Sequence, residues 1–260
     1  MTGTIKTSVS EGVASLWLDR PKEMNALDAA TAQAIIDALK GLAADPKVRV
    51  LVLGGSGLVF SAGGDFNWVL SWPKLSEQER QDGALVMMGA IQAVQDFPKP
   101  SIARVHGSAV GGGVGLMLAC DYAVAASTAR FGLTSARNGL LAAIAIPGLL
   151  QAVGRRKTRQ LLLHGGLFDA AQALEIGLID RVVPAEALDA EVATLAKELT
   201  LGAPSVQKLA KELVAEIDAL PHDADVVRLL AGHVAAQSVT EEAIEGMSAF
   251  LAKRKPKWAI

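Results

Sequence analysis

Two glycine-rich turns contain the residues of this chain that are best suited to do chemistry. They read Ser61-Ala62-Gly63-Gly64-Asp65 and Gly111-Gly112-Gly113, and each follows an apolar run typical of a buried strand. Glycines let bare N–H groups approach a ligand atom, because no side chain stands in the way and positive φ is allowed. Two such donors that converge on one oxygen form an oxyanion hole. The pattern therefore predicts a site that stabilises a negatively charged oxygen.

The second turn lies between elements that strengthen this interpretation. Residues 100–105 predict a strand, and residues 115–120 predict a helix that continues from the glycines. N–H groups at a helix start have no acceptor within the helix, and the helix dipole places positive charge there. One glycine triplet alone suits a plain tight turn between a strand and a helix. A second turn of the same character favours a binding site.

Composition bounds the class of protein. The 260 residues suffice for one large domain with a substantial core, and the net charge of −2 gives no reason to expect a polyanionic partner. Aromatic residues are too scattered for base stacking, so we expect no nucleic acid. Cys120 lies in an apolar helical stretch, is the one cysteine, and cannot form an internal disulfide. The start lacks an apolar signal core, so we expect a cytoplasmic protein without membrane contact.

The order of predicted elements indicates an α/β core followed by helices. Strands are expected at 5–9, 13–18, 47–53 and 121–126, and helices at 28–42 and 78–97. After Val183-Pro184 the pattern becomes helical only. We therefore expect an α/β domain over 1–184 and a helical region for packing and oligomerisation over 185–260. The helices expected in that region span 185–199, 205–217, 223–237 and 241–253.

The motifs and their order also resemble a known family, and the resemblance covers nearly the whole chain. The matching segments are Leu18 to Leu27, Phe60 to Asp65, Lys99 to Ala103, Gly111-Gly112-Gly113, Ala119-Cys120-Asp121, Phe131 to Thr134 and Ala170 to Val183. Together they are similar to the crotonase (enoyl-CoA hydratase/isomerase) superfamily. Within it, residues 65–68 and 113–116 resemble the methylglutaconyl-CoA hydratase-like members most.

This resemblance implies a spiral of ββα units with a C-terminal helical region, assembled as trimers or hexamers. It implies an acyl-CoA substrate of fatty acid metabolism, with the thioester oxygen held by the N–H groups of Gly64 and Gly112 and no separate cofactor. The residues that it places against the substrate are Lys22, Met24, Ala26, Ala62, Asp65 and Phe66. For Lys22, a solvated surface role is as good an interpretation as a phosphate contact.

Two positions depart from the hydratase pattern. Hydratase-like members carry glutamates where this chain has Gly115 and Ser135. Some methylglutaconyl-like members also have glycine at the first position. A serine hydroxyl does not titrate near neutral pH and cannot replace a carboxylate as proton donor without an adjacent base.

Other side chains are candidates for the acid/base group. Asp65 suits a helix cap as well as catalysis. Arg137 suits either a substrate carboxylate or a structural ion pair. His106 and His164 have no carboxylate partner in the sequence, which favours structural roles for both.

The remaining observations leave three functions open. Trp68 and Trp72 suit the core or an acyl pocket, and no His/Cys/Asp cluster has metal-ligand spacing, so we expect no metal. The leading hypothesis is an enoyl-CoA hydratase/isomerase-type enzyme. The second is another crotonase-type reaction, namely isomerisation, decarboxylation or thioester hydrolysis. The third is a catalytically weak acyl-CoA-binding subunit.

Overall fold

Two sheets form the frame of the molecule. The structure is a computed structural model that describes residues 3–218, 220–221 and 223–259. The larger sheet has six strands in the order β1-β2-β3-β4-β6-β9, and the smaller has three in the order β5-β7-β8. Only β1 runs antiparallel in the larger sheet. The strands are β1 (Ile5–Ser10), β2 (Val13–Leu18), β3 (Val50–Gly55), β4 (Ser101–Val105), β5 (Ala109–Val110), β6 (Tyr122–Ala126), β7 (Arg130–Gly132), β8 (Leu167–Asp169) and β9 (Arg181–Val183).

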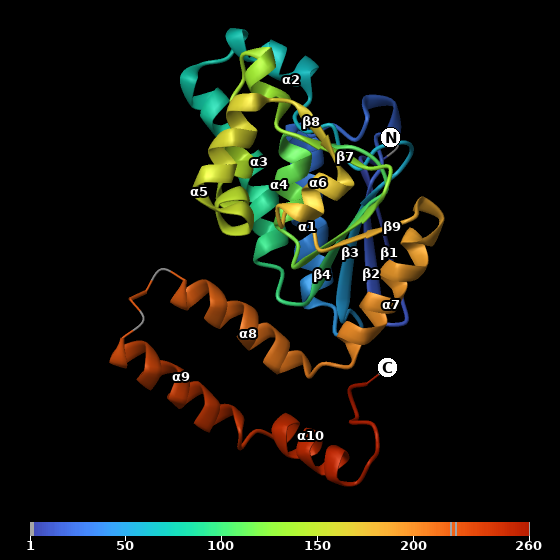
Figure 1. Ribbon diagram of the computed structural model, residues 1–260, viewed down its shortest axis with the longest axis vertical. Coiled ribbons are helices and arrows are strands. Elements are labelled where there is room, and N and C mark those ends of the chain that lie inside the picture. Colours follow the sequence, from blue (N-terminus) through green and yellow to red (C-terminus); the bar gives the residue numbers. More distant parts are fainter. Residues whose placement is uncertain (1–2, 219, 222, 260) are drawn as a thin grey trace.

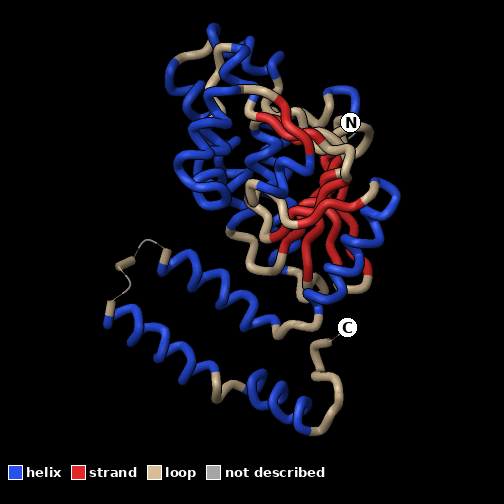
Figure 2. Tube along the Cα trace, viewed as in Figure 1, coloured by secondary structure: helices blue, strands red, loops and turns tan. Residues whose placement is uncertain are grey.

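Helices cover both faces of the larger sheet (Figure 2). The helices of the body are α1 (Ala29–Ala44), α2 (Phe66–Ser71), α3 (Glu77–Gln95), α4 (Gly112–Leu118), α5 (Ile146–His164), α6 (Ala170–Glu175) and α7 (Leu188–Thr200). Because side chains alternate along a strand, Leu51 and Leu53 face the core beneath α1 and α3. Val50 and Val52 face the opposite core, against α7.

The chain passes repeatedly between the two sheets. β4 lies in the larger sheet, β5 in the smaller, and α4 follows; β6 and β7 repeat the same pattern before α5. The opening hairpin lies where the sequence predicts it, whereas β3 spans Val50–Gly55 rather than residues 47–53, because residues 46–47 form a turn. Helix α4 begins earlier than expected, at Gly112 rather than residue 115. The glycine turn is therefore itself the start of the helix.

Three further helices project from the body as an arm (Figure 1). We use "arm" for α8 (Pro204–Ile217), α9 (Ala224–Gln237) and α10 (Glu241–Leu251). The predicted helices are present, but α7 packs on the sheet, so the projecting part starts at α8. The domain boundary at residue 184 stays a prediction. None of the helices in the described parts of the chain is long and apolar enough to cross a membrane.

One arginine fastens both ends of the arm to the body. Arg49, just before β3, donates to the carbonyls of Thr200 (3.2 Å) and Gly202 (2.8 Å), where the chain leaves for the arm. It also donates to the carbonyl of Trp258 at 2.6 Å, where the chain returns. The Trp258 indole N–H donates to the Leu201 carbonyl at 3.1 Å. Exit and return therefore lie at the same point of the body.

Candidate functional site

The two glycine turns lie side by side. Ser61 forms a parallel bridge with Ala109. The Ser61 N–H donates to the Ser108 carbonyl, and the Ser61 carbonyl accepts from the Val110 N–H. A Cβ placed on Gly63 would lie 2.6 Å from the Val110 carbonyl oxygen. Gly63 also has φ +88°, a conformation that side-chain-bearing residues rarely adopt. Only glycine permits this approach of the two turns.

The N–H of Gly64 is aimed into open space by its neighbours. Leu27 donates to the Gly63 carbonyl at 2.7 Å and accepts from the Asp65 N–H at 2.8 Å. Since the peptide unit is planar and trans, the Gly64 N–H must point opposite to the Gly63 carbonyl, away from Leu27. A Cβ added to Gly64 would meet no atom within 4 Å. This N–H donates to no acceptor within the described residues.

The N–H of Gly112 is free for a different reason. Gly112 is the first residue of α4, where an N–H has no acceptor in the preceding turn. Gly111 precedes it with φ +53°, and its own N–H is engaged by the Gly132 carbonyl at 2.8 Å. A Cβ on Gly112 would lie 3.7 Å from the Gly64 nitrogen. Two N–H groups without protein acceptors in the described structure therefore stand next to each other.

A buried polar network supports the first turn. The Asn25 side chain accepts from the Arg20 N–H at 3.0 Å and donates to the carbonyls of Ser56 and Val59. The Ser61 hydroxyl donates to the Asn25 carbonyl at 2.8 Å and accepts from the Gly63 N–H at 3.2 Å. Sequence reasoning missed these roles. The available signal was polar Asn25 between the apolar residues Met24 and Ala26.

Asp65 is a helix cap with an ion pair. Its carboxylate accepts from the N–H groups of Asn67 (2.9 Å) and Trp68 (3.2 Å) at the start of α2. The Arg20 guanidinium lies 2.9 Å from its other oxygen. Burial raises the pKa of Asp65, but the Trp68 N–H and Arg20 hold that pKa below its ordinary value. This favours the capping interpretation, because a carboxylate so held stays ionised near neutral pH and is a poor proton donor.

The residues predicted to contact substrate surround this turn. Ala62 donates to the Met24 carbonyl at 2.9 Å, which brings segment 22–26 against the glycines. Lys22, Met24 and Phe66 are exposed, whereas Ala26 is buried. Their substrate contacts stay predictions, but the fold does bring them together.

The two positions without glutamate differ in surroundings. A Cβ at Gly115 would lie 3.3 Å from the Ile144 carbonyl oxygen and 3.4 Å from the Ile91 side chain, so α4 packs closely there. Ser135 is half-buried, and its hydroxyl lies 3.6 Å from where a Cβ on Gly111 would stand. Ser135 is therefore beside the second turn, in a place that accepts a side chain.

The other candidates lie in structural contacts. His106 is half-buried, its Nε2 lies 3.0 Å from the Gly57 carbonyl oxygen, and burial lowers its pKa. Arg137 is exposed and donates to the His164 carbonyl from two nitrogens, each at 3.3 Å. Trp68 and Trp72 pack edge to face with ring centroids 5.1 Å apart.

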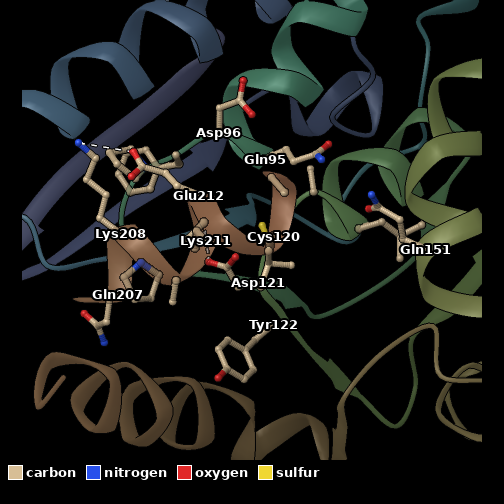
Figure 3. A pocket seen from close by; sticks show the side chains of 18 of the residues that line it. Gln95, Asp96, Cys120, Asp121, Tyr122, Gln151, Gln207, Lys208, Lys211 and Glu212 are labelled. Carbon is tan, nitrogen blue, oxygen red and sulfur yellow. Dashed lines mark hydrogen bonds and ion pairs between the residues drawn. The ribbon is translucent and has the colours of Figure 1, made fainter. Parts of the chain in front are cut away.

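A cavity of about 1050 Å³ lies elsewhere, between α8 and the body. Figure 3 shows Lys211 of α8 beside Asp121, and their charged atoms are 2.8 Å apart. Asp121 precedes β6, at the amino end of the parallel strands, whereas the second glycine turn follows the carboxyl end of β4. Neither glycine turn lines this cavity. The candidate site therefore rests on the turns and not on this cavity.

Comparisons with known proteins show the family to which the chain belongs. The sequence pattern of the family described as enoyl-CoA hydratase/isomerase matches residues 8–259. The chain belongs to the enoyl-CoA hydratase/isomerase family. A Thermus thermophilus protein provisionally named enoyl-CoA hydratase is 37% identical over 246 residues, covering 95% of this chain and 97% of that protein. The crotonyl-CoA hydratase of Syntrophomonas wolfei is 34% identical over 258 residues, covering 94% of each.

A solved structure confirms the predicted fold of this enoyl-CoA hydratase/isomerase family member. An enoyl-CoA hydratase from Shewanella pealeana superposes with a TM-score of 0.94 at 30% identity, covering 98% of this chain and 96% of that one. The crotonase-type α/β architecture with C-terminal helices is therefore established for the chain.

Proposed function

We propose that the chain acts on acyl-CoA thioesters and stabilises an enolate-like transition state with the N–H groups of Gly64 and Gly112. The observation that carries the proposal is the pair of adjacent N–H groups that have no protein acceptor in the described structure. When a proton leaves the α carbon of a thioester, or water adds to the β carbon of an enoyl thioester, negative charge develops on the carbonyl oxygen. Each preorganised donor at that oxygen contributes about 3 kcal/mol.

The missing carboxylates limit which reaction this site performs well. Hydration needs a group that transfers a proton, and such a group contributes about 10²–10⁴-fold. Gly115 and Ser135 carry none, and Asp65 is engaged by Arg20 and α2. We therefore propose slow crotonyl-CoA hydration. The same observation favours two other candidates. One is an isomerisation or decarboxylation in which enolate stabilisation dominates, or a thioester hydrolysis in which the same donors stabilise a tetrahedral oxyanion. The other is acyl-CoA binding with little turnover.

An infrared measurement tests the proposal directly. Binding of an acyl-CoA with a ¹³C-labelled thioester carbonyl should shift its stretching band to lower frequency, because two hydrogen bonds polarise the C=O bond. The shift does not depend on knowing the reaction. A bound thioester with the band position that it has in water would contradict the proposed site.

We also propose that the arm is covered by further copies of this chain, as a homotrimer or hexamer. Its helices expose large apolar side chains, with Phe250 at 82% and Leu251 at 81%. Monomeric proteins rarely expose contiguous apolar patches of this kind.

Light scattering should therefore give a mass of three or six chains at micromolar concentration. Phe250→Glu should lower the mass, because a charge in an apolar interface is costly. Leu163→Glu, at a 79% exposed position on α5, is the matched control and should leave the mass unchanged. A monomeric mass for the unmodified protein would exclude the assembly.

A further inference from the structure

One guanidinium joins the two segments that hold Gly64. The Nη1 atom of Arg20 lies 3.1 Å from the Asp28 carboxylate and donates to the Ala26 carbonyl at 2.8 Å. Its Nη2 atom lies 2.9 Å from the Asp65 carboxylate. The Arg20 side chain is only 17% exposed, so these charges are weakly screened by solvent.

Both carboxylates begin helices. Asp28 accepts from the Thr31 N–H at 2.7 Å at the start of α1. Asp65 does the same for α2 through Asn67 and Trp68. Arg20 therefore couples two helix starts that would otherwise be independent. Those starts directly follow Leu27 and Gly64, the two residues of the isolated parallel bridge.

This arrangement controls the direction of the Gly64 N–H. The Gly63–Gly64 peptide plane is set by the hydrogen bond from Leu27 to the Gly63 carbonyl, and that bond needs the two segments in register. Arg20 contacts the Ala26 carbonyl and the Asp28 carboxylate on one side of the bridge and the Asp65 carboxylate on the other. A hydrogen bond weakens steeply as its angle falls, so a tilt of this plane would weaken donation to a ligand oxygen.

We propose that Arg20 is a positioning residue for the Gly64 donor, acting through the Asp28–Arg20–Asp65 contact. The inference rests on the proposed function of Gly64. It requires the planar fork of arginine, which presents donors to two carboxylates and one carbonyl at once. Lysine is a single point charge on a flexible stem and would satisfy only part of the set.

The test compares variants of the full chain with a ¹³C-labelled acyl-CoA as the probe. Arg20→Gln should lose most of the infrared shift of the bound thioester carbonyl, while the Kd for acyl-CoA changes by only about threefold, since one weakened hydrogen bond contributes little net binding free energy. Arg20→Lys should restore part of the shift. Arg181→Gln is the matched control and should keep the full shift, because Arg181 lies on the edge strand β9 and pairs with Glu191 at 2.6 Å.

A second variant protects the test against a folding defect. Asp65→Asn removes the charge that Arg20 contacts but leaves a residue that caps helices well. It should also lose most of the shift, with a smaller change in Tm than Arg20→Gln. A full shift in a folded Arg20→Gln or Asp65→Asn protein would overturn the positioning role. If the unmodified protein itself shows no shift, the proposed function of Gly64 and Gly112 fails instead.

Discussion

Replacing Ser135 with glutamate should raise the rate of crotonyl-CoA hydration by about 10²–10⁴-fold, the range for one positioned general acid/base. Ser135 lies beside Gly111, at the edge of the proposed oxyanion site, in a half-buried place that accepts a side chain. A carboxyl there would supply the proton transfer that the native site lacks. The initial rate of loss of the enoyl absorbance measures the effect.

Ser135→Gln is the control for this gain. It has nearly the shape of glutamate but does not titrate, so it should leave hydration slow. Gly115→Glu should help less, because a side chain there meets the Ile144 carbonyl and Ile91 at 3.3 and 3.4 Å. Fast hydration by the unmodified protein would show that another group transfers the proton. The absence of a gain in a folded, acyl-CoA-binding Ser135→Glu protein would show that a carboxyl at this position does not supply the proton transfer.

Replacing Gly112 with proline should lower turnover by about 10²–10³-fold, the cost of one oxyanion donor. Proline removes the N–H, yet Gly112 is the first residue of α4, the helix position at which proline is best tolerated. The loss should therefore reflect the donor more than a broken helix. Hydration in the Ser135→Glu background gives the rate, and titration of a CoA-thioester analogue against the otherwise native chain gives the affinity, which should fall as well.

Gly112→Ala is the matched control for the proline variant. Its methyl group would meet the nearest atoms at 3.6 to 3.7 Å, which is ordinary contact, and the N–H is retained. It should keep most of the activity. Equal affinity of the proline variant and the parent for the thioester analogue would show that Gly112 is not an oxyanion donor.

The adjacency of the two turns follows from local features that the sequence displays. The first turn follows β3, and the second follows β4 after the short strand β5. Because β3 and β4 are neighbouring parallel strands, their carboxyl ends lie at the same edge of the larger sheet. What holds the first turn was not predictable in this way. Arg20 and Asp65 are 45 positions apart, and nothing in the sequence around either residue identifies the other as its partner. The orientation of the Gly64 N–H depends on such non-local contacts.

The packing of the late helices shows a second limit. α7 and α8 both carry apolar residues at helical spacing, and this spacing predicts only that one face of each helix packs against another apolar surface. Leu188 and Val192 of α7 pack against the larger sheet, whereas α8 has no buried residue in the described structure. Only the tertiary arrangement distinguishes the two.

The fastening of the arm at Arg49 gives it the topology of an insertion, although it lies near the end of the sequence. Thr200 and Trp258 meet at one guanidinium, so the segment between them departs from and returns to a single anchor. A long insertion anchored in this way costs its host little, because closure entropy grows only slowly with length. Changes of length inside the arm should therefore be tolerated by the body. Loss of Trp258 would instead leave the three helices attached to the body only where the chain enters α8.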